Sequence, residues 1–192
     1  LGTYGSGESF FTIKGELECI FSGLRIPKVC YEVDQTNPSY HPGRCAKVSC
    51  NGVELGYIGQ IHPLVAKNYD IDAEIYCAEI NMTKLITLQL PEATYVPLPK
   101  YPTVSRDLAV VCDDCQTVAE VENVITDAAG KLLRKVRLFD VYKGIGIPDG
   151  KKSLAFSLEL RADDRTLTDE DSENVMHRIL TSLSEKLGAV LR

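Results

Sequence analysis

The sequence lacks long apolar runs, a surplus of positive charge and a recognisable leader. No apolar run reaches the roughly 18 residues that a membrane-spanning helix needs. The opening residues lack the basic and apolar regions of a signal peptide, so a cytoplasmic protein is expected. Because they are glycine-rich and start without Met, we also expect a fragment of a longer chain. The net charge is −6, which argues against strong non-specific nucleic-acid binding but leaves local recognition open.

The sequence also lacks the motifs of common catalytic centres. No G-x-S-x-G motif or glycine-rich phosphate loop follows a predicted strand. His41 and His62 each precede a proline and have no carboxylate at a diagnostic spacing, so structural roles are expected. Cys112 and Cys115 form a lone CxxC, whereas a zinc site would need a second pair at matching spacing. We therefore expect free thiols and no metal ligand, and an enzyme working through these groups remains an alternative without a substrate.

The length of 192 residues favours two domains of about 100 residues each. Prolines at 91, 97 and 99 exclude a regular helix or a central strand between Leu90 and Tyr101. This stretch is predicted to link one domain at residues 1–96 to a second at residues 97–192.

The first domain is predicted to be a mostly antiparallel sheet that carries helices. The expected helices cover residues 6–23, 62–69 and 81–89, and the expected strands cover 28–34, 44–49, 53–60 and 73–80. Residues 36–43 are predicted to be a loop, and Asn51-Gly52 is a strong hairpin signal. Gly15 within a helical pattern suggests a close packing partner, and Gly56 and Gly59 within a strand suggest a bulge or a close backbone approach.

The second domain is predicted to follow the order β-α-β-β-α-β, which is the ferredoxin-like split unit. Thr117 and Glu120 form a capping box before its first helix. In the strand from 153 to 160, four large apolar residues alternate with Ser153, Ala155, Ser157 and Glu159. In the strand before it, Leu138, Asp140 and Tyr142 are expected on one face, and Phe139 and Val141 on the other.

In this topology both helices cover one face of the sheet and leave the other open. Alternation and strand order place Ala109, Asp140, Tyr142 and Ser153 together on the open face. Small residues leave room for an unpaired base, Tyr142 offers a stacking ring, and Asp140 or Ser153 offers a hydrogen bond to the base edge. A solvated face and a face that docks on another protein domain are the alternatives.

Seven basic residues surround these strands: Lys131, Arg134, Lys135, Arg137, Lys143, Lys151 and Lys152. They indicate either local recognition or a charged edge that prevents aggregation.

Several motifs, in order and at compatible spacing, resemble the bacterial phenylalanyl-tRNA synthetase beta subunit. In the second domain they are Tyr101-Pro102-x-x-x-Arg106-Asp107-Leu108-Ala109-Val110-Val111, Leu138-Phe139-Asp140-Val141-Tyr142-x-Gly144, Lys152-Ser153-Leu154-Ala155, Arg165-Thr166-Leu167 and Leu191-Arg192. In the first domain they are Lys14-Gly15-x-Leu17-Glu18, Asn37-Pro38-x-x-His41-Pro42-Gly43-Arg44 and Gly59-x-Ile61-His62-Pro63. The resemblance covers nearly the whole chain.

The resemblance implies an α+β chain with two parts. Residues 1–96 would be part of a degenerate, antiparallel class II synthetase catalytic-like domain, and residues 97–192 a ferredoxin-fold anticodon-binding domain. It further implies a cytoplasmic alpha-beta heterotetramer that attaches phenylalanine to tRNA(Phe) with ATP and magnesium. The ATP and phenylalanine sites would lie in the alpha subunit. The residues facing the anticodon stem-loop would be Ala109, Asp140, Tyr142 and Ser153. The fragment itself is expected to be non-catalytic, without a cofactor or metal ligand, and to bind neither DNA nor a membrane.

Overall fold

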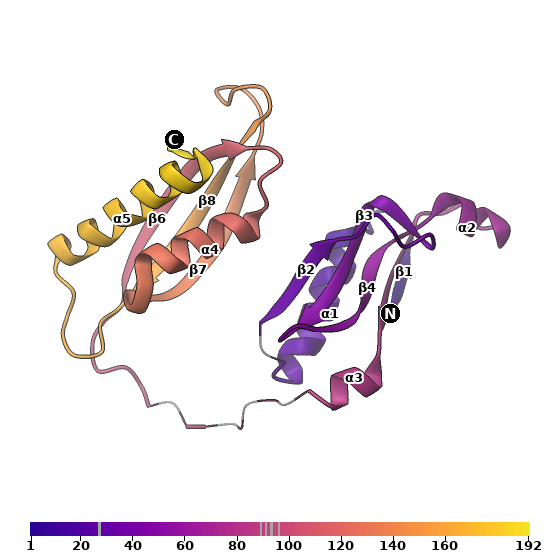
Figure 1. Ribbon diagram of the computed structural model, residues 1–192, viewed down its shortest axis with the longest axis horizontal. Coiled ribbons are helices and arrows are strands. Elements are labelled where there is room, and N and C mark those ends of the chain that lie inside the picture. The colour runs from indigo at the N-terminus through magenta and orange to yellow at the C-terminus, as the bar shows by residue number, and fades with distance from the viewer. Residues whose placement is uncertain (27, 89, 91, 93, 96) are drawn as a thin grey trace. The chain divides into compact units, whose positions relative to one another are not determined.

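A computed structural model describes residues 1–192 except 27, 89, 91, 93 and 96. The chain divides into two compact units, Leu1–Tyr95 and Val96–Arg192, and each contains its own antiparallel sheet (Figure 1). Within the predicted linker, residues 91, 93 and 96 lie outside the described part, while Pro97 and Pro99 lie in a stretch without helix or strand. The α+β class predicted from the sequence is confirmed.

The first unit is a five-stranded sheet with the order β1-β5-β4-β3-β2. Its strands are β1 (Gly2–Tyr4), β2 (Val29–Val33), β3 (Tyr40–Cys50), β4 (Val53–Ile61) and β5 (Ile75–Ile80). The helix α1 (Phe10–Gly23) packs on the sheet through Ile13, Leu17 and Phe21, which recur along one face of the helix. Two short helices, α2 (Pro63–Asn68) and α3 (Met82–Ile86), follow β4 and β5. Gln89, the expected end of the last helix, lies outside the described residues.

The predicted strands of the first unit were wrong at two places. The expected loop at 36–43 overlaps β3, which begins at Tyr40. Tyr40 pairs with Ile61, and the register then shifts before Cys45 pairs with Gly59. Pro42 has no N–H to donate to a neighbouring strand. It lies in this irregular stretch, where the regular ladder is interrupted, so no ladder hydrogen bond is lost. The second error is at Gly2–Tyr4, which was not recognised as a strand but pairs with β5.

The glycines of the first unit differ in how closely other atoms surround them. A Cβ at Gly56 would come within 1.8 Å of the Glu79 carbonyl oxygen, and one at Gly59 within 2.5 Å of the Arg44 carbonyl oxygen. The predicted close backbone approach is therefore confirmed. A Cβ at Gly15 would meet nothing within 4 Å, so the packing partner predicted there was wrong.

This contrast predicts opposite effects of two alanine substitutions. Gly15→Ala is expected to stabilise the first unit by about 0.5–1 kcal/mol, because alanine loses less backbone freedom in a helix. Gly56→Ala, the matched control, is expected to lose on the order of 1–3 kcal/mol, because the new methyl displaces the β5 backbone. Urea unfolding of both variants measures the difference, and a destabilised Gly15→Ala would contradict this packing.

The second unit has the order β6 (Val104–Asp113), α4 (Val118–Ala129), β7 (Leu133–Tyr142), β8 (Lys151–Leu160), α5 (Asp169–Leu187) and β9 (Val190–Leu191), with a short 3₁₀ turn (Gly130–Leu132) before β7. The sheet order is β7-β8-β6-β9, and both helices lie on the same face (Figure 1). The ferredoxin-like topology predicted from the sequence is confirmed.

The core of the second unit lies between this covered face and the two helices. Leu154, Phe156, Leu158 and Leu160 of β8 are fully buried there, as their alternation predicted. The capping box of Thr117 and Glu120 is present, and a second one joins Thr168 and Asp171 at the start of α5. Hydrogen bonds from Thr117 and Thr168 hold the pKa values of Glu120 and Asp171 below their usual range. Among the described residues of this unit, no helix lies on the opposite face of the sheet.

A β-bulge in β7 changes the predicted distribution of side chains on that strand. Leu138 pairs with Phe156, and the next paired residue is Asp140, opposite Ala155. Phe139 is therefore the extra residue of the bulge. The expectation that Leu138 shares a face with Asp140 was wrong, because one inserted residue reverses the alternation. Leu138 packs against the core instead.

Candidate nucleic-acid interface

Four predicted residues lie on the open face of the second unit. They belong to two neighbouring rows, each made of residues that pair directly across the strands. Asp140 lies opposite Ala155, which lies opposite Ala109. Tyr142 lies opposite Ser153, which lies opposite Val111 on β6. Side chains directly opposite each other in such pairs are about 5 Å apart at Cβ. Ala109, Asp140, Tyr142 and Ser153 therefore form one continuous patch across three strands.

The four residues differ in how far they reach the surface. Asp140 is exposed, and Ala109 and Tyr142 are partly exposed. Ser153 is only 2% exposed, so its hydroxyl contributes almost nothing to the free surface. Asp140 and the Tyr142 ring are thus the accessible polar and aromatic groups of this patch.

Contacts with the following loop and with the C-terminal residue hold the Tyr142 ring. Its hydroxyl donates a hydrogen bond to the Ile145 carbonyl oxygen at 3.3 Å. A Cβ at Gly144 would lie 2.9 Å from that hydroxyl oxygen, and its φ of +156° also favours glycine. The Arg192 guanidinium carbon lies 5.1 Å from the ring centroid, which is a cation–π distance. A pre-positioned ring loses little conformational freedom when a base stacks on it.

Sequence reasoning missed Arg192 as a member of this site. The Arg192 N–H donates to the Ala109 carbonyl oxygen at 3.0 Å, and so places the residue beside the first predicted site residue. The predicted topology could have identified Arg192, because it places the last strand beside β6. Extending the pairing by one residue would have brought this guanidinium to the open face.

The loop between β7 and β8 is attached to the turn after β6. The Asp114 carboxylate pairs with the ammonium group of Lys143, which holds the pKa of Asp114 below its usual range. The Lys152 ammonium donates to the Asp114 carbonyl oxygen at 2.9 Å, and the Asp114 N–H donates to the Gly150 carbonyl oxygen at 2.8 Å. Both ends of the loop are therefore fixed near Tyr142, while Ile145 at its tip is 95% exposed.

The predicted non-catalytic roles of the histidines and cysteines fit their surroundings. The Nδ1 atoms of His41 and His62 accept hydrogen bonds from the backbone N–H groups of Gly43 and Leu64, respectively, which is a structural role. All seven cysteines are free thiols. Burial raises the pKa of the Cys112 thiol, which opposes thiolate chemistry at the CxxC. Within the described part of the chain, no three His, Cys, Asp or Glu side chains are placed to hold a metal ion.

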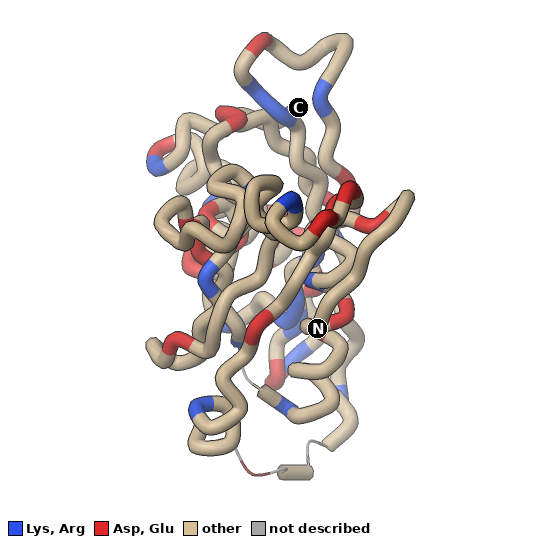
Figure 2. Tube along the Cα trace, turned by 90° about the vertical axis from the view of Figure 1, so that its right-hand side faces the viewer, with Lys and Arg blue, Asp and Glu red and all other residues tan. Residues whose placement is uncertain are grey.

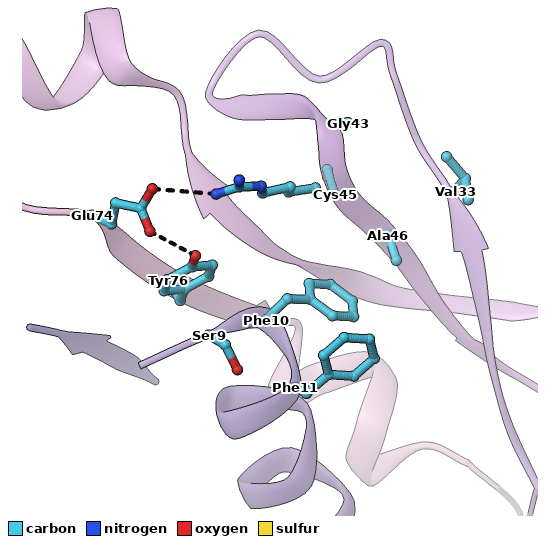
Figure 3. Close-up of a pocket in the computed structure, with 10 residues that line it drawn as sticks. Ser9, Phe10, Phe11, Val33, Gly43, Cys45, Ala46, Glu74 and Tyr76 are labelled. Atoms are coloured by element: carbon cyan, nitrogen blue, oxygen red, sulfur yellow. Dashed lines mark hydrogen bonds and ion pairs between the residues drawn. The ribbon is translucent and has the colours of Figure 1, made fainter. Parts of the chain in front are cut away.

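The first unit contains a cavity of about 530 Å³ beside the start of α1 (Figure 3). Its walls include Phe10, Phe11 and Ala46. The Glu74 carboxylate accepts hydrogen bonds from the Tyr76 hydroxyl at 3.0 Å and from Arg44 at 3.3 Å, and these bonds lower its pKa. Burial raises the pKa of Cys45 to about 11, so its thiol stays protonated near neutral pH. The Glu74 carboxylate is thus paired with Tyr76 and Arg44, and the Cys45 thiol is not activated as a nucleophile.

Charge is mixed over the surface of both units. Figure 2 shows acidic and basic residues interspersed along the trace, without a long segment of one sign. Among the described residues, no helix combines the length and the apolar character required to cross a bilayer. The split β-α-β-β-α-β order and its four-stranded antiparallel sheet define the second unit as a ferredoxin-like domain.

Comparison with known proteins gives the family. Residues 99–192 match the ferredoxin-fold anticodon binding domain, and residues 3–82 match the phenylalanyl tRNA synthetase beta chain CLM domain. The whole chain is 43% identical to the phenylalanine–tRNA ligase beta subunit of Clostridium tetani and 38% identical to that of Clostridium acetobutylicum. The identity to the Bacillus licheniformis subunit is 42% over 95% of the chain. The chain belongs to the phenylalanine–tRNA ligase beta subunit family and matches its C-terminal part. It spans 24% of the length of the two clostridial relatives and 23% of the Bacillus one.

Proposed function

We propose that residues 97–192 bind the anticodon stem-loop of tRNA(Phe) through the open face of the sheet. The observation that carries this proposal is the pairing of Tyr142 with Ser153, next to the row of Asp140, Ala155 and Ala109. An aromatic ring, a free carboxylate and small neighbours on a flat sheet suit an unstacked base. The match to an anticodon-binding family over the same residues supports this function.

Each residue has a distinct role in this proposal. The Tyr142 ring stacks on a base, and the Asp140 carboxylate accepts hydrogen bonds from a base edge. Ala109 leaves room for the base to approach the strand backbone. Ser153 reaches the base only where the bound nucleotide displaces the groups that cover it, because its side chain is buried in the free chain. Arg192 adds a cation next to the stacking ring.

The larger enzyme performs the chemistry in this proposal. The chain is the C-terminal part of a beta subunit in a cytoplasmic alpha-beta heterotetramer that attaches phenylalanine to tRNA(Phe) with ATP and magnesium. Residues 1–96 serve as a catalytic-like part in assembly, consistent with the paired Glu74 and the protonated Cys45. The described residues lack a cluster suited to a metal ion, so no step at magnesium is assigned to this chain.

A titration of the 192-residue chain with the anticodon stem-loop of tRNA(Phe) tests the proposal. We expect specific binding with a shallow dependence on salt, because few cations of this face are available to contact phosphates. A stem-loop with a changed anticodon is the control and should bind more weakly. If neither RNA bound, the alternative would be favoured, in which the open face docks on another protein domain and contacts no RNA.

A further inference from the structure

The open face carries a hollow beside the patch around Tyr142. Its volume is about 310 Å³, at the lower end of the range for small-ligand sites. The lining residues come from three strands: Asp107, Lys135, Arg137, Phe139, Ser157 and Glu159. Arg137 lies opposite Ser157, which lies opposite Asp107, in the row of paired residues beside that of Asp140. The hollow and the Tyr142 patch are therefore neighbours on one surface.

The β-bulge places the aromatic wall of this hollow, Phe139, on the same face as Asp140 and Tyr142. Without the bulge, strict alternation from Arg137 would also bring Phe139 to the open face, but it would turn Asp140 and Tyr142 toward the helices. The extra residue keeps Arg137, Phe139 and Asp140 all on the open side. Phe139 is 55% exposed, so its side chain is accessible on this face.

The two cations of the hollow differ from most of the basic residues around them. Lys143, Lys151 and Lys152 each lie within ion-pair distance of Asp113 or Asp114. Arg134 on the same strand pairs with Asp163 at 2.7 Å. The side chains of Lys135 and Arg137, by contrast, form no hydrogen bond or ion pair with any described residue. They lie on β7, at the edge of the sheet, while the acceptors Asp107 and Glu159 lie on the inner strands.

We propose that this hollow is a second nucleotide subsite, which takes the nucleotide next to the one stacked on Tyr142. Phe139 stacks on the base, Arg137 and Lys135 contact its phosphate, and Asp107 and Glu159 accept hydrogen bonds from its amino groups. Single-stranded nucleic acid is bound by such a combination of stacking rings and cations along the backbone. The division of the hollow into a cationic edge and an acidic interior matches the phosphate and base ends of one nucleotide. This inference rests on the proposed anticodon-binding function.

Binding of the anticodon stem-loop to the full chain, measured at several salt concentrations, tests the subsite. Arg137→Gln is expected to weaken binding about 3- to 10-fold and to lower the salt slope by about one. Lys131→Gln is the matched control, because it removes the same charge from the 3₁₀ turn outside the hollow. Equal effects of these two substitutions would overturn the inference.

Two substitutions of Phe139 distinguish the contribution of base stacking from that of an apolar side chain of similar size. Phe139→Ala is expected to weaken binding about 5-fold or more, and Phe139→Leu, which keeps an apolar side chain without a π face, should weaken it nearly as much. Wild-type binding by both variants, with binding weakened by Tyr142→Ala, would overturn this subsite alone and favour a protein-docking role for Phe139. An absence of binding by the unmodified chain would overturn the proposed function as well.

Discussion

Tyr142→Ala is expected to lower the affinity of the chain for the anticodon stem-loop by about 5- to 150-fold. Loss of one base–aromatic stack costs about 1–3 kcal/mol, which corresponds to that range. The ring is partly exposed and lies on the sheet face, so its removal should leave the core intact. A fluorescence titration of variant and wild type against the same RNA measures the change, and a thermal melt verifies the fold.

Tyr142→Phe is the matched control for this prediction. It keeps the ring and its contact with Arg192, and loses only the hydrogen bond from the hydroxyl to the Ile145 carbonyl oxygen. Binding close to that of wild type is expected, because stacking depends on the ring. If the alanine variant bound the RNA as tightly as wild type, the stacking role would be wrong. If the phenylalanine variant lost as much affinity as the alanine variant, the hydroxyl would be the important group instead.

The largest effect on stability is expected for Phe156→Ala. Phe156 is fully buried in the core of the second unit, on the central strand β8. Removing such a ring costs on the order of 3–5 kcal/mol, because the neighbours collapse only partly into the space. Single domains have about 5–15 kcal/mol of stability in total, so this variant should unfold at a much lower urea concentration.

Phe139→Ala provides the comparison within the same pair of strands. Its ring is more than half exposed, and a surface substitution of this kind changes stability by about 0.5 kcal/mol or less. Peptide-resolved hydrogen exchange of residues 97–192 in urea separates the second unit from the first. Equal destabilisation by the two substitutions would contradict the burial described for these phenylalanines.

The covered face of the second unit was predictable from the sequence because β8 alternates without interruption. A continuous period of two assigns every side chain of that strand to a face once one residue is placed. Topology then followed from the order of elements, since a split βαββαβ unit has a fixed strand order. The RNA-binding interpretation came from the family resemblance, because alternation alone does not distinguish a solvated face from one that binds RNA.

The errors in prediction arose where one residue or a distant segment changes the local pattern. The bulge at Phe139 reverses alternation in β7, and nothing in the letters LFDVY marks an unpaired residue. The burial of Ser153 depends on what covers it across the sheet, which a single strand does not reveal. Arg192 reaches the Tyr142 ring from the far end of the chain, so its role depends on tertiary structure.

Photochemical crosslinking of the anticodon stem-loop to the 192-residue chain is the most direct test of the central claim. The RNA would carry a photoreactive base at one anticodon position at a time, and mass spectrometry would identify the crosslinked peptides. The proposed interface predicts crosslinks on β7 and β8, above all at Tyr142, with a loss of these crosslinks in Tyr142→Ala. Crosslinks confined to α4, α5 or residues 1–95 would contradict the claim that the open face of the sheet binds the anticodon.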